Sequence, residues 1–494
     1  MGIRRQRGDR DARIGMRPIM RLAARLGVVA TVLATLALSG CGGRDGPANE
    51  ALPNGQHNAG YDLAGMNASS GRPDILILVG ISGGGKRSAA FAHGVLRGMR
   101  DVPVSLPGGP PSTLLAEVDQ LAGVSGGAFP AAHYALHGAR SFERFPEDFL
   151  YRDIAAYVWG TYVLPWHWGW LVDPRIGTND RMAEVYDDVL FQGATYGDLM
   201  RRGRPRLSIN ATDLATGAAF PFLPFSFDVI CSDLARFPLA RAVAASNGFP
   251  LLFTPITLTN HRGPACSEPL PIDLSRRLGP GEYYRMQLFE TVRRMADPAR
   301  TRWLHLMDGG ISDNLGLRTA LNFIELGVTE DAHYVQQMLP VRRVVLLSID
   351  GQSQTDPALS NQRMVNGLVQ IFDAVSGSQI DNYNLETQAR AQAIGQQVTR
   401  GQRDARCARG RTYEGFPCDD VQALFVRIAL ADVADPARRA RLRAIPTGLT
   451  IPREDVDALL AAGEEAVRAN RGLADFLAGA TDVAGATPPF QPRR

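Results

Sequence analysis

The chain has 494 residues, of which 45% are hydrophobic, so it can bury the core of one large domain or of two. Its net charge is +3, but residues 1–40 carry eight arginines against Asp9 and Asp11, which leaves the rest of the chain near −3. This balance excludes a strongly basic surface of the kind that binds nucleic acid.

Residues 1–40 have the order of a bacterial secretion signal. An arginine-rich stretch ends at Arg25, an apolar run follows over residues 26–38, and two small residues precede Cys41. The apolar run is too short to span a bilayer as a mature helix. Residues 38–41 resemble the lipobox of bacterial lipoproteins, so we expect a signal peptide over 1–40 and acylation of Cys41. An ordinary cleaved signal with a chance cysteine is the alternative.

Acylation of Cys41 would anchor the chain to a bilayer. In similar lipoproteins an aspartate after the cysteine favours the inner membrane, so Gly42 favours the outer membrane and a domain that faces the periplasm. Met16 and Met20 are alternative start residues. Residues 41–72 are rich in Gly, Asn, Ala and Ser without apolar periodicity, which predicts a flexible tether.

Residues 73–350 alternate between strand and helix patterns. Strands are predicted at 74–80, 118–121, 206–210, 303–307 and 344–349, and helices at 89–99 and 127–136. The first strand is a continuous apolar run, as expected of a strand buried on both faces of a parallel sheet. The alternation indicates an α/β layered domain, with insertions near 141–200 and 260–300.

The last part of the chain has a different pattern. Residues 351–480 predict a mainly helical C-terminal extension, which includes a helix at 453–469 just after Pro452. Residues 481–494 predict a disordered tail.

Four cysteines follow Cys41, and an even number in an exported chain suggests disulfides. Among three possible connectivities we expect the pairs that are near in sequence, Cys231–Cys266 and Cys407–Cys418. No Cys-x-x-Cys spacing occurs and the eight histidines are scattered, so we expect no metal site.

Ser125 lies in a Gly-x-Ser-x-Gly pattern, Gly123 to Gly127, between a predicted strand and a predicted helix. The flanking glycines allow a sharp turn that pushes the serine side chain into a cleft. The following helix directs its positive end toward developing negative charge. We interpret Ser125 as a nucleophile that needs a base and oxyanion donors. A capping serine on a glycine-rich turn is the alternative.

Three consecutive glycines, Gly83, Gly84 and Gly85, follow the first predicted strand. They let backbone N–H groups converge on a small anion, which predicts an oxyanion hole. The alternative is a phosphate-binding Walker loop, because Gly80-x-x-x-x-Gly85-Lys86 fits its first seven positions. The eighth position should be Ser or Thr to hold magnesium, and it is Arg87.

Asp308 follows the predicted strand at 303–307 and precedes Gly309 and Gly310. A carboxylate at a strand end with glycines behind it can approach another loop closely, which makes Asp308 a candidate for the acidic residue of the site. A turn-capping aspartate is the alternative. We assign the nearby Asp313 to turn structure or to an interaction with Asn314.

Together these segments resemble the patatin-like phospholipases, which have a glycine-rich oxyanion loop, Gly-x-Ser-x-Gly and a catalytic Asp-Gly-Gly or Asp-Gly-Ala. Residues 205–217 resemble the central strand of that family, and residues 245–255 resemble its Ser-x-x-x-Pro-x-x-Phe-x-Pro segment. The resemblance covers about residues 74–350. It implies a three-layer α/β/α fold with a central, mostly parallel sheet. One departure is Ser88, where the family often has glycine.

The resemblance also implies a mechanism. Ser125 would attack an ester carbonyl, Asp308 would take and return the proton without a histidine, and Gly83 to Gly85 would hold the oxyanion. Water would then hydrolyse the acyl-enzyme. The implied substrates are membrane lipids, with no cofactor, no nucleic acid and no identified protein partner.

Two alternative functions follow from the sequence. The first is an α/β-hydrolase triad in the order serine, acid, histidine. Only His333 follows Asp308, while His133 and His137 fall in the helix after Ser125 and His305 in a strand. The second, from another class, is a non-catalytic envelope lipoprotein that uses the fold as a binding or scaffold module.

Four of the five tryptophans lie within residues 159–170, in the first insertion. Tryptophan and tyrosine favour the membrane interface, so an exposed patch there would help to lift a phospholipid from a bilayer. A buried cluster, or a lid over the cleft, is the alternative.

Overall fold

Strand β1 (Ile75–Ile81) lies in the interior of the main sheet, and all seven of its residues are buried. It pairs in parallel with β4 (Val118–Gly123) on one side and with β9 (Arg343–Asp350) on the other. Successive side chains point to opposite faces, so Leu76 and Ile77 belong to two separate core clusters. Because both faces are covered, the strand is apolar without interruption.

The main sheet has eight strands among the described residues, in the order β12-β9-β1-β4-β5-β8-β7, with β6 paired to β5. All neighbours from β12 to β5 are parallel, whereas β6, β7 and β8 run antiparallel to their partners. The remaining bounds are Arg206–Asp213 (β5), Ala219–Pro221 (β6), Ile256–Thr259 (β7), Trp303–Met307 (β8) and Gln422–Ala429 (β12). Two small antiparallel pairs are β2 (Pro103–Val104) with β3 (Ser112–Thr113) and β10 (Thr412–Tyr413) with β11 (Phe416–Pro417).

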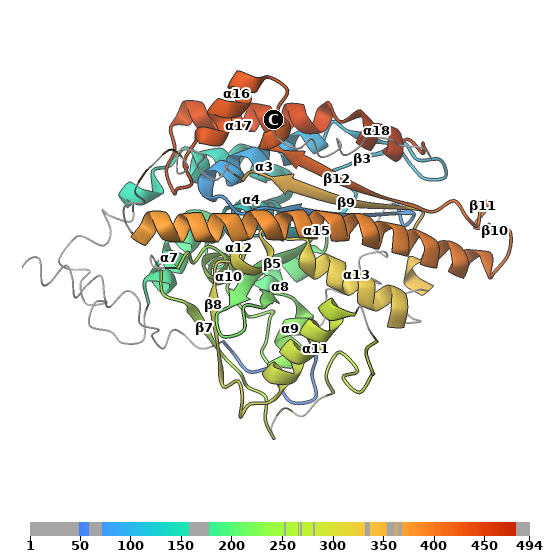
Figure 1. Cartoon of the computed structure of the whole chain (residues 1–494), viewed down its shortest axis with the longest axis horizontal. Coiled ribbons are helices and arrows are strands. Elements are labelled where there is room, and N and C mark those ends of the chain that lie inside the picture. Colours follow the sequence, from blue (N-terminus) through green and yellow to red (C-terminus); the bar gives the residue numbers. More distant parts are fainter. Residues whose placement is uncertain are drawn as a thin grey trace, which may run out of the picture.

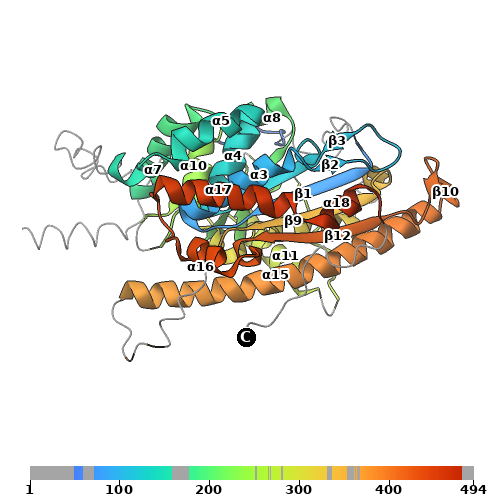
Figure 2. The ribbon, with the colours of Figure 1, turned by 90° about the horizontal axis from the view of Figure 1, so that it is seen from above.

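Helices cover both faces of the sheet (Figures 1 and 2). One layer contains α3 (Gly85–Met99), α4 (Ala128–His137) and α17 (Arg453–Arg468), whose apolar side chains join the larger core cluster. The opposite layer contains α13 (Arg318–Glu330) and the long α15 (Leu368–Cys407), which contribute to the second cluster. The predicted three-layer α/β/α fold with a mostly parallel sheet is confirmed.

Helix α17 packs directly on α3, backbone against backbone. A Cβ on Gly94 of α3 would lie 2.2 Å from the carbonyl oxygen of Leu460, and one on Gly463 of α17 would lie 2.3 Å from that of Phe91. Only glycine permits this approach. The segment 351–480 therefore supplies both a sheet strand (β12) and a covering helix (α17), and is built into the layers of the preceding domain rather than appended to it.

This computed structural model describes residues 49–58, 72–157, 177–250, 253–264, 266, 269–279, 282–330, 336–352, 361, 363 and 368–480. Its shorter helices are α5 (Ser141–Phe145), α7 (Thr178–Tyr186), α8 (Tyr196–Arg202), α9 (Pro224–Val229), α10 (Leu239–Ser246), α11 (Tyr283–Ala296), α12 (Gly310–Asp313), α16 (Pro436–Ala444) and α18 (Arg471–Leu477). Single 3₁₀ turns lie at Ser125–Gly127, Gly138–Arg140 and Leu430–Asp432, and π-helical turns at Pro146–Leu150 and Asp187–Phe191.

Several predictions fall on residues outside these ranges. They are the acylation of Cys41, the tryptophan-rich segment at 159–170, the position of His333 and the tail after residue 480. Within the ranges that are described, no helix has both the length and the apolar character needed to cross a bilayer.

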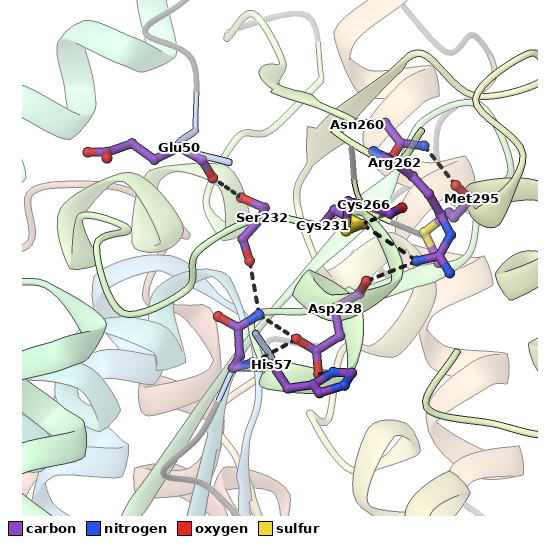
Figure 3. The surroundings of a disulfide bond; sticks show 10 residues. Glu50, His57, Asp228, Cys231, Ser232, Asn260, Arg262, Cys266 and Met295 are labelled. Atoms are coloured by element: carbon purple, nitrogen blue, oxygen red, sulfur yellow. Dashed lines mark hydrogen bonds and ion pairs between the residues drawn. A yellow bond between two sulfur atoms is a disulfide. The ribbon is translucent and has the colours of Figure 1, made fainter. Parts of the chain in front are cut away.

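Residues 49–58, expected to belong to a flexible tether, are bound to the domain beside a disulfide (Figure 3). Cys231 is bonded to Cys266, and the carbonyl oxygen of Cys231 accepts the N–H of Leu52 at 2.9 Å. The side chain of Asn49 donates to Ser232 Oγ at 2.8 Å. The second pair that was expected, Cys407 with Cys418, is also bonded in the structure.

The Cys231–Cys266 bond should contribute more stability than Cys407–Cys418, because it closes the longer loop. The sequence separations are 35 and 11 residues. Chain-entropy arguments give about 3–4 kcal/mol for the first and about 1 kcal/mol less for the second. We expect denaturant unfolding of the two double-serine variants to show this order. An equal or greater loss for the 407/418 variant would contradict it.

Candidate active site

Ser125 lies immediately after β4, on the turn that leads into α4. Its φ is +49°, in the left-handed region that non-glycine residues rarely adopt. Strained backbone of this kind clusters at active sites and is a feature of the nucleophile turn. The side chain is 8% exposed, so its hydroxyl is sheltered from bulk water.

The glycines beside Ser125 let its turn pack against the Gly83–Gly85 loop. A Cβ on Gly126 would lie 2.1 Å from the carbonyl oxygen of Gly85, and one on Gly127 would lie 2.6 Å from that of Ile81. No side chain fits at either position without a backbone shift. The Gly-x-Ser-x-Gly pattern therefore brings the serine and the glycine loop into contact.

Asp308 lies at the end of β8 and reaches Ser125 directly. Ser125 Oγ is 2.8 Å from Asp308 Oδ2, and the N–H of Gly310 donates to Asp308 Oδ1 at 2.8 Å. The two residues are 183 positions apart in the sequence, and β4 and β8 are separated in the sheet by β5. The fold thus brings together the two groups that the sequence predicts as nucleophile and base.

Burial raises the pKa of Asp308 to about 6, against the lowering effect of the hydrogen bonds from Gly310 and Ser125. Asp308 is 8% exposed, so few waters solvate its charge. The carboxylate remains ionised at neutral pH, yet it is a stronger base than an exposed aspartate. Both properties are those required of a general base.

The three glycines of the loop have different roles in the structure. The N–H of Gly83 donates to the carbonyl oxygen of Asn314 at 3.1 Å, so it is not available to an oxyanion. Among the described residues, no acceptor bonds the N–H groups of Gly84 and Gly85, whose φ angles are +131° and +60°. Helix α3 begins at Gly85, which adds the positive end of a helix at this place. Of the three N–H groups expected to form an oxyanion hole, those of Gly84 and Gly85 are therefore the two without an acceptor among the described residues.

The family model of the patatin-like phospholipases matches residues 80–321, a span that contains the glycine loop, Ser125 and Asp308. The chain contains a patatin-like phospholipase domain.

Solved structures of human GIVD cytosolic phospholipase A2 are also similar to this chain. One has a TM-score of 0.40, with 12% identity over 85% of this chain and 65% of that one. Its complex with methyl gamma-linolenyl fluorophosphonate has a TM-score of 0.36, with 12% identity over 85% and 62%. This chain therefore covers less than two thirds of those human chains. No curated protein matches the sequence.

The residues that follow the glycine loop hold it in place. Arg87 donates to the carbonyl oxygens of Gly351 and Ile445, at 3.0 and 2.5 Å, and Lys86 Nζ donates to that of Arg152 at 2.6 Å. Because both cations are bonded to protein carbonyls, they do not form the phosphate site of a Walker loop. Ser88, the departure from the family pattern, bonds the carbonyl oxygen of Ser82 at 2.7 Å.

The segment Ser246–Gly248 lies beside both predicted catalytic residues, and no local sequence pattern indicates its role. Ser246 Oγ accepts the N–H of Ser125 at 2.9 Å and donates to the carbonyl oxygen of Asn210 at 2.6 Å. The N–H of Asp308 donates to the carbonyl oxygen of Gly248 at 3.0 Å. These contacts show that Ser246 and Gly248, within the segment that resembles Ser-x-x-x-Pro-x-x-Phe-x-Pro, hold the backbone of Ser125 and of Asp308.

The histidines that the structure describes lie away from the pair. His133 Nδ1 is 2.8 Å from Ser141 Oγ, and His305 Nδ1 is 3.0 Å from Thr257 Oγ1. Neither has a contact with Ser125 or Asp308. Asp313 Oδ2 accepts the N–H of Arg318 at 2.8 Å at the start of α13, which is the structural role expected of it. No group of three potential metal ligands occurs among the described residues.

A cavity of about 220 Å³ is lined by residues of α11, α12, α13 and α15 and by residues 217–219. Arg318 and Glu386 in its lining form an ion pair at 3.1 Å. Neither Ser125 nor Asp308 lines it, although the N–H of Ile311, which does, donates to the carbonyl oxygen of Asp308. The cavity therefore lies beside the Asp308 segment, and neither predicted catalytic residue belongs to its lining.

Proposed function

We propose that the protein is a lipid acyl hydrolase in which Ser125 and Asp308 form a catalytic dyad. The 2.8 Å contact between Ser125 Oγ and Asp308 Oδ2 is the observation that supports this most directly. The burial of both side chains and the pKa of Asp308 near 6 support the same assignment.

The proposed reaction has two halves. Asp308 takes the proton of Ser125 as Oγ attacks the ester carbonyl, and the N–H groups of Gly84 and Gly85 bind the oxyanion. Asp308 then gives the proton to the leaving alcohol, and the acyl-enzyme remains on Ser125. Water attacks this ester in the second half, with Asp308 again as base, and releases the fatty acid.

We further propose that Cys41 carries the lipid anchor and that the substrates are lipids of the bilayer to which it attaches. The lipobox-like residues 38–41 support the anchor, and Gly42 supports the outer membrane with the domain in the periplasm. Phospholipids, lysophospholipids and neutral acyl esters are all within this class.

Two measurements test the proposal on the purified full chain. Incubation with defined phospholipids should release free fatty acid and a lysolipid, which mass spectrometry of the products identifies. A fluorophosphonate should label the chain covalently, with the modified peptide containing Ser125. Intact lipids together with an unlabelled Ser125 would refute the enzyme and favour a non-catalytic scaffold.

The pH dependence of the reaction follows from Asp308. The base works only when ionised, so kcat/KM should rise with pH and level off above about pH 6, where the buried carboxyl has lost its proton. Stopped assays with a soluble ester between pH 4.5 and 8 would measure this limb. A profile that is flat from pH 4.5 would mean that Asp308 is not the base.

A further inference from the structure

Asn247 provides Ser125 Oγ with a second hydrogen-bond partner besides Asp308. Its Oδ1 lies 3.1 Å from Ser125 Oγ, and its Nδ2 lies 3.0 Å from the hydroxyl of Tyr186. Tyr186 is 1% exposed and Asn247 is 9% exposed. The four side chains therefore form one buried polar chain from Tyr186 through Asn247 and Ser125 to Asp308.

The number of hydrogens on these four side chains favours one direction of the hydrogen bonds between them. Ser125 has one hydroxyl hydrogen, which it cannot donate to both Asn247 Oδ1 and Asp308 Oδ2. With Nδ2 toward Tyr186, the phenol accepts, and its own hydrogen has no acceptor among the described residues. Burial also raises the pKa of Tyr186, so the phenol keeps that hydrogen. A buried donor without an acceptor is costly.

Turning the Asn247 amide about its last torsion exchanges Oδ1 and Nδ2 and gives both hydroxyl hydrogens, those of Tyr186 and Ser125, an acceptor. Tyr186 then donates to Asn247 Oδ1, Asn247 Nδ2 donates to Ser125 Oγ, and Ser125 donates to Asp308. We propose that Asn247 is a further catalytic residue, whose amide donates to Ser125 Oγ, and that Tyr186 is the positioning residue that fixes this orientation.

Backbone hydrogen bonds fix the chain on both sides of Asn247, and they thereby limit the positions that its side-chain amide can take. The N–H of Asn247 donates to the carbonyl oxygen of Val243 at 3.0 Å, at the end of α10. The carbonyl oxygens of its two neighbours, Ser246 and Gly248, accept the N–H groups of Gly309 and Asp308. The same short segment therefore sets the position of the amide relative to both members of the dyad.

The inference rests on the proposed function and adds a donor to it. As Asp308 withdraws the proton, negative charge grows on Ser125 Oγ before the new C–O bond is complete. An N–H aimed at Oγ stabilises that charge and leaves the single hydroxyl hydrogen for Asp308. Hydrogen bonds to charged groups are the stronger kind, so removal of this one should lower kcat by about 10- to 100-fold.

Three variants test the assignment, with kcat and KM measured on a p-nitrophenyl ester and the rate of fluorophosphonate labelling measured in parallel. Asn247→Ala should lower kcat and the labelling rate by about 10- to 100-fold with little change in KM. Asn247→Asp keeps the shape but offers only acceptors when ionised, so it should be at least as slow. Tyr186→Phe should cost about 3- to 10-fold, because a neutral hydrogen bond is lost.

Tyr196→Phe is the matched control, since it removes the hydroxyl of another buried tyrosine, on α8, whose ring stacks on Phe222. It should keep wild-type rates, and thermal melting should confirm that every variant folds. An Asn247→Asp variant as fast as wild type would show that the amide accepts from Ser125 and would overturn the inference. So would an Asn247→Ala variant with unchanged kcat, which leaves the dyad itself intact. Wild-type protein without activity or label would overturn the proposed function as well.

Discussion

Replacing Ser125 with alanine should lower ester hydrolysis by about 10³- to 10⁶-fold, because no other group can form the acyl-enzyme. The substitution removes only the hydroxyl oxygen. Alanine has the same Cβ as serine, so the left-handed backbone of residue 125 is no more strained than before. The variant should therefore fold with the thermal stability of the wild type. Initial rates on a soluble ester and fluorophosphonate labelling would measure the loss.

Ser348→Ala is a suitable control for that experiment. Ser348 is fully buried on β9, two strands from β4, and its hydroxyl has no partner among the described residues. Its replacement should leave the rate within a factor of two of wild type. Substantial turnover by Ser125→Ala, with this control normal, would assign the nucleophile to another residue.

Replacing Asp308 with asparagine should separate activity from stability. Loss of the base should lower kcat by about 10²- to 10⁴-fold. The same change should stabilise the fold at pH 8, because an ionised carboxylate is no longer buried. A pKa raised from 3.8 to about 6 corresponds to a penalty of up to about 3 kcal/mol.

The sign of this stability effect depends on pH. The folded state holds the proton of Asp308 more tightly than the unfolded state, so the penalty is complete above about pH 6 and disappears below 3.8. Urea unfolding should show Asp308→Asn about 1–3 kcal/mol more stable than wild type at pH 8 and nearly equal at pH 4. A variant less stable than wild type at pH 8 would mean that the carboxylate contributes more through its hydrogen bonds than it costs by burial.

The sequence predicted the parts of the site that local pattern encodes. Glycines around Ser125 and behind Asp308 are required wherever one backbone approaches another, and they mark such places in any sequence. The apolar runs before them identify buried strands, although β8, the strand before Asp308, runs antiparallel to β5. The pairing of Ser125 with Asp308, 183 positions away, was implied by the resemblance to the patatin-like phospholipases.

Other parts of the site depend on tertiary partners that no local pattern contains. The N–H of Gly83 is taken by the carbonyl oxygen of Asn314, a partner 231 positions away, so a run of three glycines provides two free donors and not three. Asn247 contacts Ser125 only because α10 ends beside the serine turn. Likewise, β12 enters the sheet after a 40-residue helix, α15, which gave the segment its helical signal.

The attachment of residues 49–58 beside the Cys231–Cys266 bond limits where the domain can go. Asn49 is fixed by Ser232, Thr259 and His261. Asn49 follows Cys41 by eight positions, a reach of about 28 Å when fully extended. If Cys41 carries the proposed acyl chains, only a short connection joins the membrane anchor to the folded domain. The edge of the domain that holds Asn49 would then stay close to the leaflet in which Cys41 is anchored.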